Sequence, residues 1–435
     1  MTKNSKLPIL VIFTTVVLDS MGIGIIIPVM PALFADVTGT EKISEIAIWG
    51  GLLASTFALM QFIFGPILGA LSDKYGRKPI LLLALFVMAA YYLVMGFAQT
   101  LWLLFVGRLI GGITAATHST ANAYMADISL PEEKAARFGM LGAGFGLGFV
   151  LGPLIGGLLG EWGPRTPFFV AAILAAANGV LCFFVLKESL NKKNRREFMW
   201  YRANPIGAIL DLRKFEGIYP LLLVFLLFSI GTSIYPAIWP FFTVERFGWS
   251  PSMIGISLTI YGICFAIVQG VLVRPAIKIW GEKKTIIIGF CFELSAMVTF
   301  AFLTNGKILV ILIPLASLGV LAQPAIQAIL SKSVGDDRQG AIQGVASSLN
   351  AISMVIAPLT MTWVLAVFSD KTAKYYFPGM PFLLSALMVL LCLFIISTTV
   401  DNQDKYPDPI ELLHLKISPT HHFYTNEILY TFHLA

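Results

Sequence analysis

Long apolar segments recur along this chain from one end to the other, and short polar loops separate them. A helix needs about 20 mostly apolar residues to cross the hydrocarbon core of a bilayer, and twelve segments meet that requirement. The strict apolar–polar alternation of membrane β-barrel strands is absent from them. The pattern predicts an all-α integral membrane protein with twelve transmembrane helices, at about residues 7–34, 46–71, 79–98, 101–126, 136–161, 167–186, 219–243, 251–276, 285–304, 308–331, 340–368 and 380–399.

The longest internal polar loop, residues 187–218, separates the first six predicted spans from the last six. Its Asn204-Pro205 pair is typical of a helix start, so we expect a short amphipathic helix at the membrane surface there. The predicted domains are an N-terminal six-helix bundle at 1–186, a cytoplasmic linker at 187–218, a C-terminal six-helix bundle at 219–399 and a cytoplasmic tail at 400–435.

The two sets of six spans are related by an internal repeat. Gly76 matches Gly281 and Pro153 matches Pro358, each 205 residues later in the chain, and intervening residues match at the same offset. A constant offset over about 80 residues indicates duplication. We therefore expect two pseudo-symmetric bundles with a substrate route between them.

The distribution of charge predicts how the chain is oriented. With a cytoplasmic N-terminus, 23 of the 30 Lys and Arg residues fall on cytoplasmic segments, six fall on outer loops, and Arg108 lies inside a span. Cytoplasmic loops of membrane proteins are enriched in Lys and Arg. Both termini are therefore predicted to be cytoplasmic, and the net charge of +6 requires no nucleic-acid partner.

Motifs for a metal, a cofactor or an enzymatic reaction are missing. The four cysteines lie singly within predicted spans, and the histidines of the last 35 residues match no standard metal-site spacing. The chain contains no HExxH or GxSxG motif and no phosphate-binding loop, and its loops are too short for a catalytic or sensor domain. We expect no metal, no cofactor, no enzymatic activity and an irregular tail.

The charged hairpin "GALSDKYGRKP", which begins at Gly69, resembles the signature loop between spans two and three of the major facilitator superfamily. The resemblance covers nearly all of residues 8–399 and implies that family's transporter fold. It also implies a cytoplasmic gate in which Asp73 partners backbone or an arginine across the two halves. The alternative is a basic turn that only sets topology. The predicted gate residues are Gly69, Asp73, Gly76, Arg77, Lys78 and Asp127.

Further stretches are similar to proton-driven drug antiporters, in particular to tetracycline-efflux-type transporters. They are "LFVGRLIGGITAA" in span four, "GAGFGLGFVLGPLIGG" in span five and "LDSMGIGIIIPVMP" in span one. Tetracycline exporters carry an acid in span three, where this chain has Tyr91, and a histidine in span eight, where it has Phe265. These departures argue against a tetracycline–metal complex as the substrate.

Three ionisable residues inside spans are candidates for proton coupling. Asp19 and Glu293 are carboxyls that could bind a proton, while Arg108 stays charged and could hold a nearby carboxylate ionised. We expect Asp19 to be the partner of Arg108, because it is the candidate nearest to Arg108 in depth within the membrane. The alternatives are a structural carboxyl at Asp19, a structural pair at Arg108 and a location near water for Glu293.

Neutral polar and aromatic residues within spans are candidates for binding the substrate. Gln323 and Gln327 are four residues apart and so share one helix face. Hydrogen bonds between helices, or an aromatic belt at the lipid interface, are the alternative roles. The candidates are Gln61, Tyr92, Asn122, Tyr235, Gln269, Gln323, Gln327 and Asn350.

Span five repeats glycine at every fourth position. This face has almost no side chains, so it permits close helix contact, and the proline within it weakens the helix. The glycine repeat is consistent with a tight helix contact that opens during transport. It is equally consistent with static packing. The residues are Gly144, Gly148, Gly152, Pro153 and Gly156.

These features together predict a proton-coupled secondary transporter. We expect it to export a small amphipathic drug or metabolite across a bacterial inner membrane by alternating access, as a monomer. Its partners would be the substrate, protons and the lipid bilayer. Proton-coupled uptake of a polar nutrient by the same fold is the alternative, since the direction of flux is not set by these motifs.

Overall fold

The computed structural model describes residues 6–115, 117–200, 217–335, 338–372 and 374–399. Within these ranges, eleven helical segments are long and apolar enough to cross a membrane. One of them, Pro251–Phe302, is 52 residues long and turns at Gly281, so it contains the two spans predicted at 251–276 and 285–304. The predicted all-α fold with twelve spans is confirmed.

The first half is built from helices joined by short loops. Pro28 and Pro31 lie where the first span is interrupted by a 3-10 turn, as expected for residues that cannot donate a backbone hydrogen bond. Its elements are α1 (Lys6–Ile26), η1 (Ile27–Val29), α2 (Met30–Thr38), α3 (Ile43–Tyr75), α4 (Arg77–Phe97), α5 (Leu101–Thr114), α6 (Thr117–Ile128), η2 (Pro131–Glu133), α7 (Lys134–Gly160) and α8 (Thr166–Val185).

The second half repeats this plan, with a π-helical turn inside its second span. Gly281 has φ 74° and the matching Gly76 has φ 111°, so both repeats turn on a glycine at the same place. Its elements, with one turn from the linker, are η3 (Lys192–Asn194), α10 (Tyr219–Thr232), α11 (Ile234–Phe247), α12 (Pro251–Ile267), η5 (Val268–Leu272), α13 (Val273–Phe302), α14 (Gly306–Ala316), η6 (Ser317–Leu321), α15 (Ala322–Lys332), α16 (Gln339–Phe368) and α17 (Met380–Thr399).

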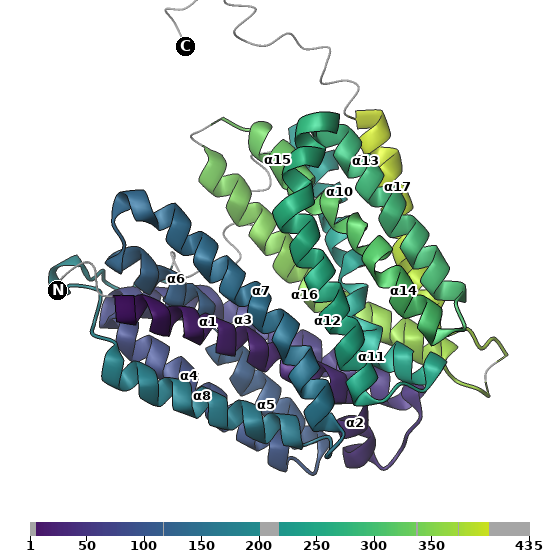
Figure 1. Ribbon diagram of the computed structural model, residues 1–435, viewed down its shortest axis with the longest axis horizontal. Helices are drawn as coiled ribbons and strands as arrows, with labels where there is room; N and C mark the ends of the chain where they lie inside the picture. The colour runs from purple at the N-terminus through teal and green to yellow at the C-terminus, as the bar shows by residue number, and fades with distance from the viewer. Residues whose placement is uncertain (1–5, 116, 201–216, 336–337, 373, 400–435) are drawn as a thin grey trace, which may run out of the picture.

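The two halves form a V. We call the side that holds the start of α1 and the end of α17 the terminal side, and the other the opposite side. In Figure 1 the helices of the two halves meet near α2 and α11 and diverge toward the start of α1 and the top of α17. The halves are therefore packed together on the opposite side and separated on the terminal side.

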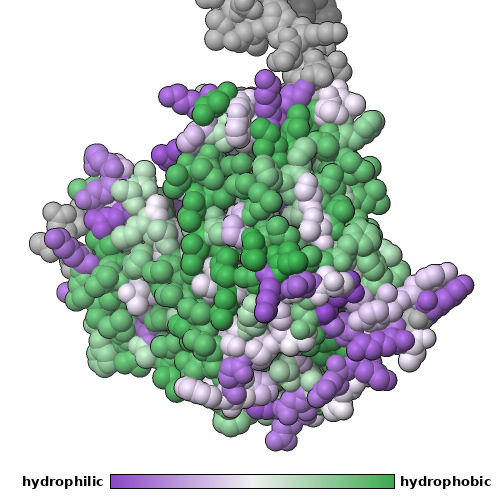
Figure 2. All heavy atoms as spheres, turned by 45° about the vertical axis from the view of Figure 1, so that its right-hand side comes forward, coloured by the Kyte–Doolittle hydropathy of each residue, from purple (hydrophilic) through white to green (hydrophobic). Residues whose placement is uncertain are grey.

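The outer surface of both halves is apolar. Figure 2 shows a broad hydrophobic surface, with hydrophilic residues gathered toward the ends of the helices. Large apolar side chains such as Trp102, Phe184 and Ile311 are more than two-thirds exposed. A continuous apolar exterior on helices of this length is suited to lipid, and the chain is a multi-pass membrane protein.

Two sequence predictions fall largely outside the described residues. The amphipathic helix expected around Asn204 lies in the range 201–216, and the predicted tail begins at residue 400. The domain boundaries at 186, 219 and 399 remain predictions, although the loops after α8 and before α10 are where the sequence places them.

Candidate functional site

The largest cavity described lies between the two halves. Its volume is about 700 Å³, and α3 and α16 line its two walls. Most lining residues are apolar, among them Phe57, Phe62 and Met354. Two of the predicted substrate-binding residues, Gln61 of α3 and Asn350 of α16, line this space from opposite halves. We call it the main cavity.

A second cavity of about 170 Å³ adjoins the main cavity and contains Arg108. The two share lining residues and therefore adjoin each other, and we call them together the connected space. Among the described residues, Arg108 is the one charged side chain that lines either of them. The shared residues are Ile23, Ala54, Phe57, Pro236 and Ala237. We call this smaller space the arginine cavity.

Arg108 makes weak contacts in place of the predicted ion pair. One guanidinium nitrogen lies 3.5 Å from the sulfur of Met30, and the group lies over the Phe57 ring at 5.7 Å. The buried Nε has no hydrogen-bond partner in the described part of the chain. No ion pair with Asp19 occurs among the described residues, so the expected partnership is wrong for this conformation.

Asp19 lies in the interior of the first half, on the other side of Tyr92. It lines a small cavity with Tyr92 and Asn178, and it lies beside the hydroxyl group of Thr117. Tyr92 also lines the arginine cavity, so Asp19 and Arg108 line two different cavities that share this residue. A Cβ on Gly22 would lie 2.5 Å from the Tyr92 hydroxyl, which explains why a glycine occupies that position.

Glu293 is buried within the second half, where its side chain packs against Gly319. Tyr235 and Tyr261 lie beside it and stack on each other with ring centroids 5.9 Å apart. Its Oε1 has no hydrogen-bond partner within the described ranges. The alternative that Glu293 lies near bulk water is therefore wrong.

The remaining predicted substrate-binding residues do not line the main cavity or the arginine cavity in this conformation. The cavity walls instead include apolar residues that sequence reasoning missed, among them Pro236 and Pro240. The prolines of α11 are the signal that could have found this wall, because they break the regularity of a span facing the other half. The residues outside both cavities are Asn122, Tyr235, Gln269, Gln323 and Gln327.

Close backbone contacts between α7 and α12 join the halves on the opposite side. Gly255 lies against the carbonyl group of Pro153, and Gly157 lies against Pro251. The hydroxyl of Thr259 donates to the Val150 carbonyl at 3.2 Å. Small residues here allow the two helix backbones to approach each other directly.

The contact between α3 and α16 extends this interface. The hydroxyl of Ser55 donates to the carbonyl of Val355 at 2.6 Å, and the Thr362 side chain fills the space left by Gly51. The rings of Phe34 and Phe241 stack between α2 and α11, with centroids 6.1 Å apart. We call these contacts, together with those of α7 and α12, the opposite-side interface.

The repeated glycines of α7 face α1 within the first half. Gly152 lies against Met21 and Gly24, and Gly144 lies against Phe13. Gly148 and Gly156 likewise contact the backbone of α1. The face that meets the second half is the adjacent one, which carries Pro153 and Gly157. The predicted close contact is present, but the four glycines are not themselves the interface between halves.

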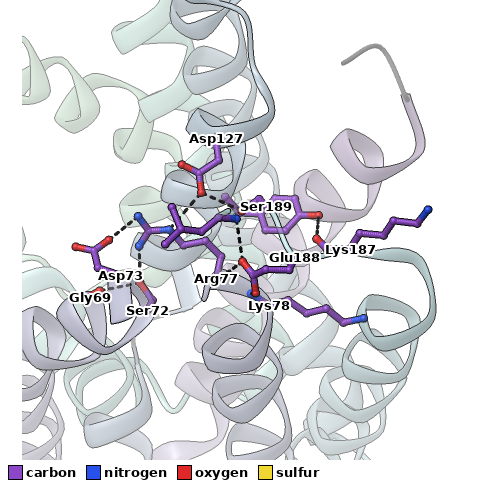
Figure 3. A network of polar contacts seen from close by, with 11 residues as sticks. Gly69, Ser72, Asp73, Arg77, Lys78, Asp127, Lys187, Glu188 and Ser189 are labelled. Atoms are coloured by element: carbon purple, nitrogen blue, oxygen red, sulfur yellow. Dashed lines mark hydrogen bonds and ion pairs between the residues drawn. The ribbon is translucent and has the colours of Figure 1, made fainter. Parts of the chain in front are cut away.

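The predicted gate residues form a network at the terminal end of the first half (Figure 3). Arg77 forms an ion pair with Asp73, donates to Asp127 at 3.4 Å, and donates to the hydroxyl of Ser72 at 2.6 Å. The Ser72 hydroxyl donates to the Gly69 carbonyl at 2.7 Å. Asp73 thus pairs within its own half, whereas the resemblance implied a partner in backbone or in the other half.

The start of the linker is bound to the same network. Glu188 accepts hydrogen bonds from the backbone N–H groups of Arg77 at 2.9 Å and Lys78 at 3.2 Å, at the first turn of α4 (Figure 3). The hydroxyl of Ser189 donates to Asp127 at 2.9 Å. Sequence reasoning missed this role for Glu188.

Two backbone groups fix the same piece of chain further. The hydroxyl of Tyr124 donates to the Lys187 carbonyl at 2.7 Å, and the backbone N–H of Arg196 donates to the Asp73 carbonyl at 3.2 Å. Residues 187–196, which we call the linker segment, therefore belong structurally to the first half.

Comparisons with known proteins agree with this architecture. The model of the Major Facilitator Superfamily matches residues 12–243 and 221–435. Tetracycline resistance protein class C of Escherichia coli is 37% identical over 390 residues, covering 90% of this chain and 96% of that protein. Multidrug resistance protein 2 of Bacillus subtilis (strain 168) is 28% identical over 366 residues, covering 82% and 88%. The nucleoside transporter NupG has the same fold, with a TM-score of 0.71 at 13% identity over 92% of this chain and 100% of that one.

Proposed function

Since this chain belongs to the major facilitator superfamily, we propose that it exports small amphipathic molecules in exchange for protons, by alternating access between its two halves. It is a transporter and not an enzyme. The single observation that carries the proposal is the connected space between the halves, closed by the opposite-side interface. We propose that it works as a monomer, without a cofactor.

The enrichment of Lys and Arg on the terminal side supports a cytoplasmic location for both termini. The main cavity then faces the cytoplasm, and the conformation described is the inward-facing one. A bacterial inner membrane is the location that suits the relatives. In this orientation substrate enters from the cytoplasm or the inner leaflet.

We assign the coupling step to three ionisable residues within the spans, of which Glu293 is buried and Asp19 and Arg108 are partly buried. Asp19 and Glu293 bind and release the transported protons, and the fixed charge of Arg108 acts on Asp19 across Tyr92. The network of Asp73, Arg77 and Asp127 opens and closes the terminal side as the halves move.

The lining of the main cavity supports export of an amphipathic molecule over uptake of a polar nutrient. Its walls are mostly apolar, and Gln61 and Asn350 supply few hydrogen-bonding groups. Similarity to proteins named for resistance to tetracycline and to multiple drugs also supports export, since removal of a drug from the cell confers resistance. Tyr91 and Phe265 make a tetracycline–metal complex a poor candidate.

The proposal is tested by proton movement in everted membrane vesicles energised by respiration. A panel of amphipathic drugs, including tetracycline and ethidium, is added while a pH-sensitive dye reports the internal pH. We expect at least one compound to release protons from vesicles that contain the wild-type protein. Asp19→Asn should abolish that release, because the carboxyl can no longer exchange a proton.

The matched control is Asp370→Asn, which changes a partly exposed aspartate on an opposite-side loop, outside both cavities. It should behave like the wild type. Proton release that persists in Asp19→Asn would remove this carboxyl from the mechanism. Uptake of compounds that requires protons to enter with them would favour the nutrient importer.

A further inference from the structure

Among the described residues, the charge of Arg108 has no acidic counterpart in the space that surrounds it. Arg108 is the one charged side chain that lines the two connected cavities within the described ranges. Asp19 lines a separate cavity behind Tyr92, and Glu293 is buried within the second half. A molecule that enters the connected space therefore meets a fixed positive charge among apolar and neutral walls.

The guanidinium group is also under-used as a hydrogen-bond donor. An arginine carries five N–H donors arranged in a planar fork. The contacts described for Arg108 are a methionine sulfur and an aromatic ring, and its Nε is buried without a partner within the described residues. A buried donor without a partner is unfavourable, so an oxyanion at this place would be stabilised.

The Tyr91 hydroxyl adds a second donor at the same place. Tyr91 lines the arginine cavity, and its buried hydroxyl has no partner in the described ranges. The ring of Tyr91 packs against those of Tyr92 and Phe57, at centroid distances of 4.8 and 6.5 Å, which fixes its orientation. An oxyanion beside Arg108 therefore has a neutral O–H donor available as well.

The sizes of the two cavities match the two parts of an amphipathic acid. The arginine cavity, at about 170 Å³, has room for a carboxylate or sulfonate group and a few water molecules. The adjoining main cavity, at about 700 Å³ and mostly apolar, has room for a hydrophobic body. The five shared lining residues let one molecule occupy both.

We propose that the substrates of this transporter are amphipathic organic anions, whose acidic group binds Arg108 while the apolar body occupies the main cavity. This proposal rests on the proposed transport function and specifies its substrate class. A cationic amphipath would place its charge against Arg108 without a carboxylate to balance it.

The test compares three probes that share one apolar body, with the purified full-length protein in lipid nanodiscs. They are 2-naphthoate, 2-naphthamide and 2-naphthylmethylammonium, which are anionic, neutral and cationic at pH 7.5. Equilibrium dialysis measures their dissociation constants. We expect naphthoate to bind about tenfold or more tightly than naphthamide, as a charge-assisted hydrogen bond implies, and the ammonium probe to bind most weakly.

Arg108→Gln should bring the naphthoate-to-naphthamide ratio close to one, whereas Arg108→Lys should keep part of the preference. Arg274→Gln, at an exposed arginine of α13 outside both cavities, is the matched control and should keep the full preference. Tyr91→Asp places a carboxylate beside Arg108, balances its charge and should bring the affinities of the three probes close together. Tyr91→Phe removes the hydroxyl alone and should lower the ratio only slightly.

Equal binding of naphthoate and naphthamide by the wild type would overturn the proposal, and so would a preference that survives in Arg108→Gln. The outcome is distinct from that of the proton-release assay. Proton-coupled export without any preference for anions would leave the transport function intact and end this inference. A clear anion preference without proton movement would do the reverse.

Discussion

At the scale of single residues, the absence of a side chain sets the distance between α1 and α7. A Cβ on Gly152 would lie 2.6 Å from the carbonyl oxygen of Met21, and a Cβ on Gly156 would overlap the backbone of Ile25. Gly142 and Gly146, on the same helix, have nothing within 4 Å of that position. Glycines of one helix therefore differ in function according to the face they occupy.

Gly156→Ala should destabilise the protein, because the added methyl group forces α1 and α7 apart. Such overpacking costs roughly 1–3 kcal/mol. Gly146→Ala is the matched control and should leave stability unchanged or slightly raised, since alanine favours a helix. The midpoint of thermal unfolding in detergent, followed by size-exclusion chromatography, measures both. Equal midpoints for the two variants would contradict the assigned contact.

Glu161 links the two halves on the opposite side through a hydrogen bond that depends on pH. Its carboxylate accepts the backbone N–H of Ser252 at 3.1 Å. Donation from the Ser252 hydroxyl and backbone, and from the Ser250 hydroxyl, holds the pKa of Glu161 below its ordinary value of 4.5. Because the pKa is lowered in the contact, the stabilisation is present above pH 4.5 and is lost as the pH falls below it.

We therefore expect acidification from pH 6 to pH 3.5 to weaken the opposite-side interface. Spin labels on the two halves, placed at Trp162→Cys and at Lys307→Cys, which lie outside the Glu161 hydrogen bonds, should show a broader distance distribution at the lower pH. In the same labelled background, Glu161→Gln should show less of this change, while Glu41→Gln, at an exposed carboxyl on the same side, should show all of it. A pH response that is identical in all three proteins would refute the role of Glu161.

At the scale of elements, the start of α4 illustrates a helix end that is capped from a distance. The first backbone N–H groups of a helix have no partner within it. Here a carboxylate more than a hundred residues away, Glu188, accepts from two of them. Gly76 makes this possible, because a Cβ there would collide with the Glu188 carboxyl group.

Glu188→Ala should loosen the first turn of α4 and the gate network with it. Loss of a capping group typically costs about 1 kcal/mol, which corresponds to roughly fivefold faster opening. Hydrogen exchange at the amides of Arg77 and Lys78, measured by mass spectrometry, should increase accordingly. Glu197→Gln, at an exposed position further along the linker, provides the control. Unchanged exchange in Glu188→Ala would show that other groups hold this turn.

The elements could be predicted from the sequence, whereas most of their mutual contacts could not. Span lengths and the turns at Gly76 and Gly281 depend on local properties, namely runs of apolar residues and the conformational freedom of glycine. The face that each helix turns toward the cavity depends on packing between distant helices. Gln323 and Gln327 share a helix face as expected, yet that face does not line the cavities.

In the candidate site too, the positions of residues along the helices could be predicted from the sequence, whereas their contacts could not. That Asp19, Arg108 and Glu293 lie inside the membrane-spanning helices follows from the sequence, because ionisable residues stand out in apolar spans. Asp19 and Arg108 line different cavities that share Tyr92, and depth along a span carries no information about that arrangement.

At the scale of the whole molecule, the V-shaped arrangement predicts which side of the membrane can reach the substrate space. Ala58 lines the main cavity, which extends toward the terminal side. In a variant without native cysteines, Ala58→Cys should react with a membrane-impermeant maleimide in inside-out vesicles and far less in right-side-out vesicles. Asp370→Cys, on an opposite-side loop, should show the reverse preference. Preferential labelling of Ala58→Cys from the outside would invert the assigned orientation.

The attachment of residues 187–196 to the first half determines where the backbone between the two halves has to flex. Because these residues move with the first half, the piece of backbone that must accommodate rocking begins at Glu197 and not at Lys187. If the gene were divided and its two products co-expressed, a cut after Arg196 would leave the gate with all its hydrogen-bond donors and acceptors. A cut after Val185 would place residues 187–196 on the fragment that carries the second half. The two fragments should then reassemble less well, although every membrane-spanning helix remains whole.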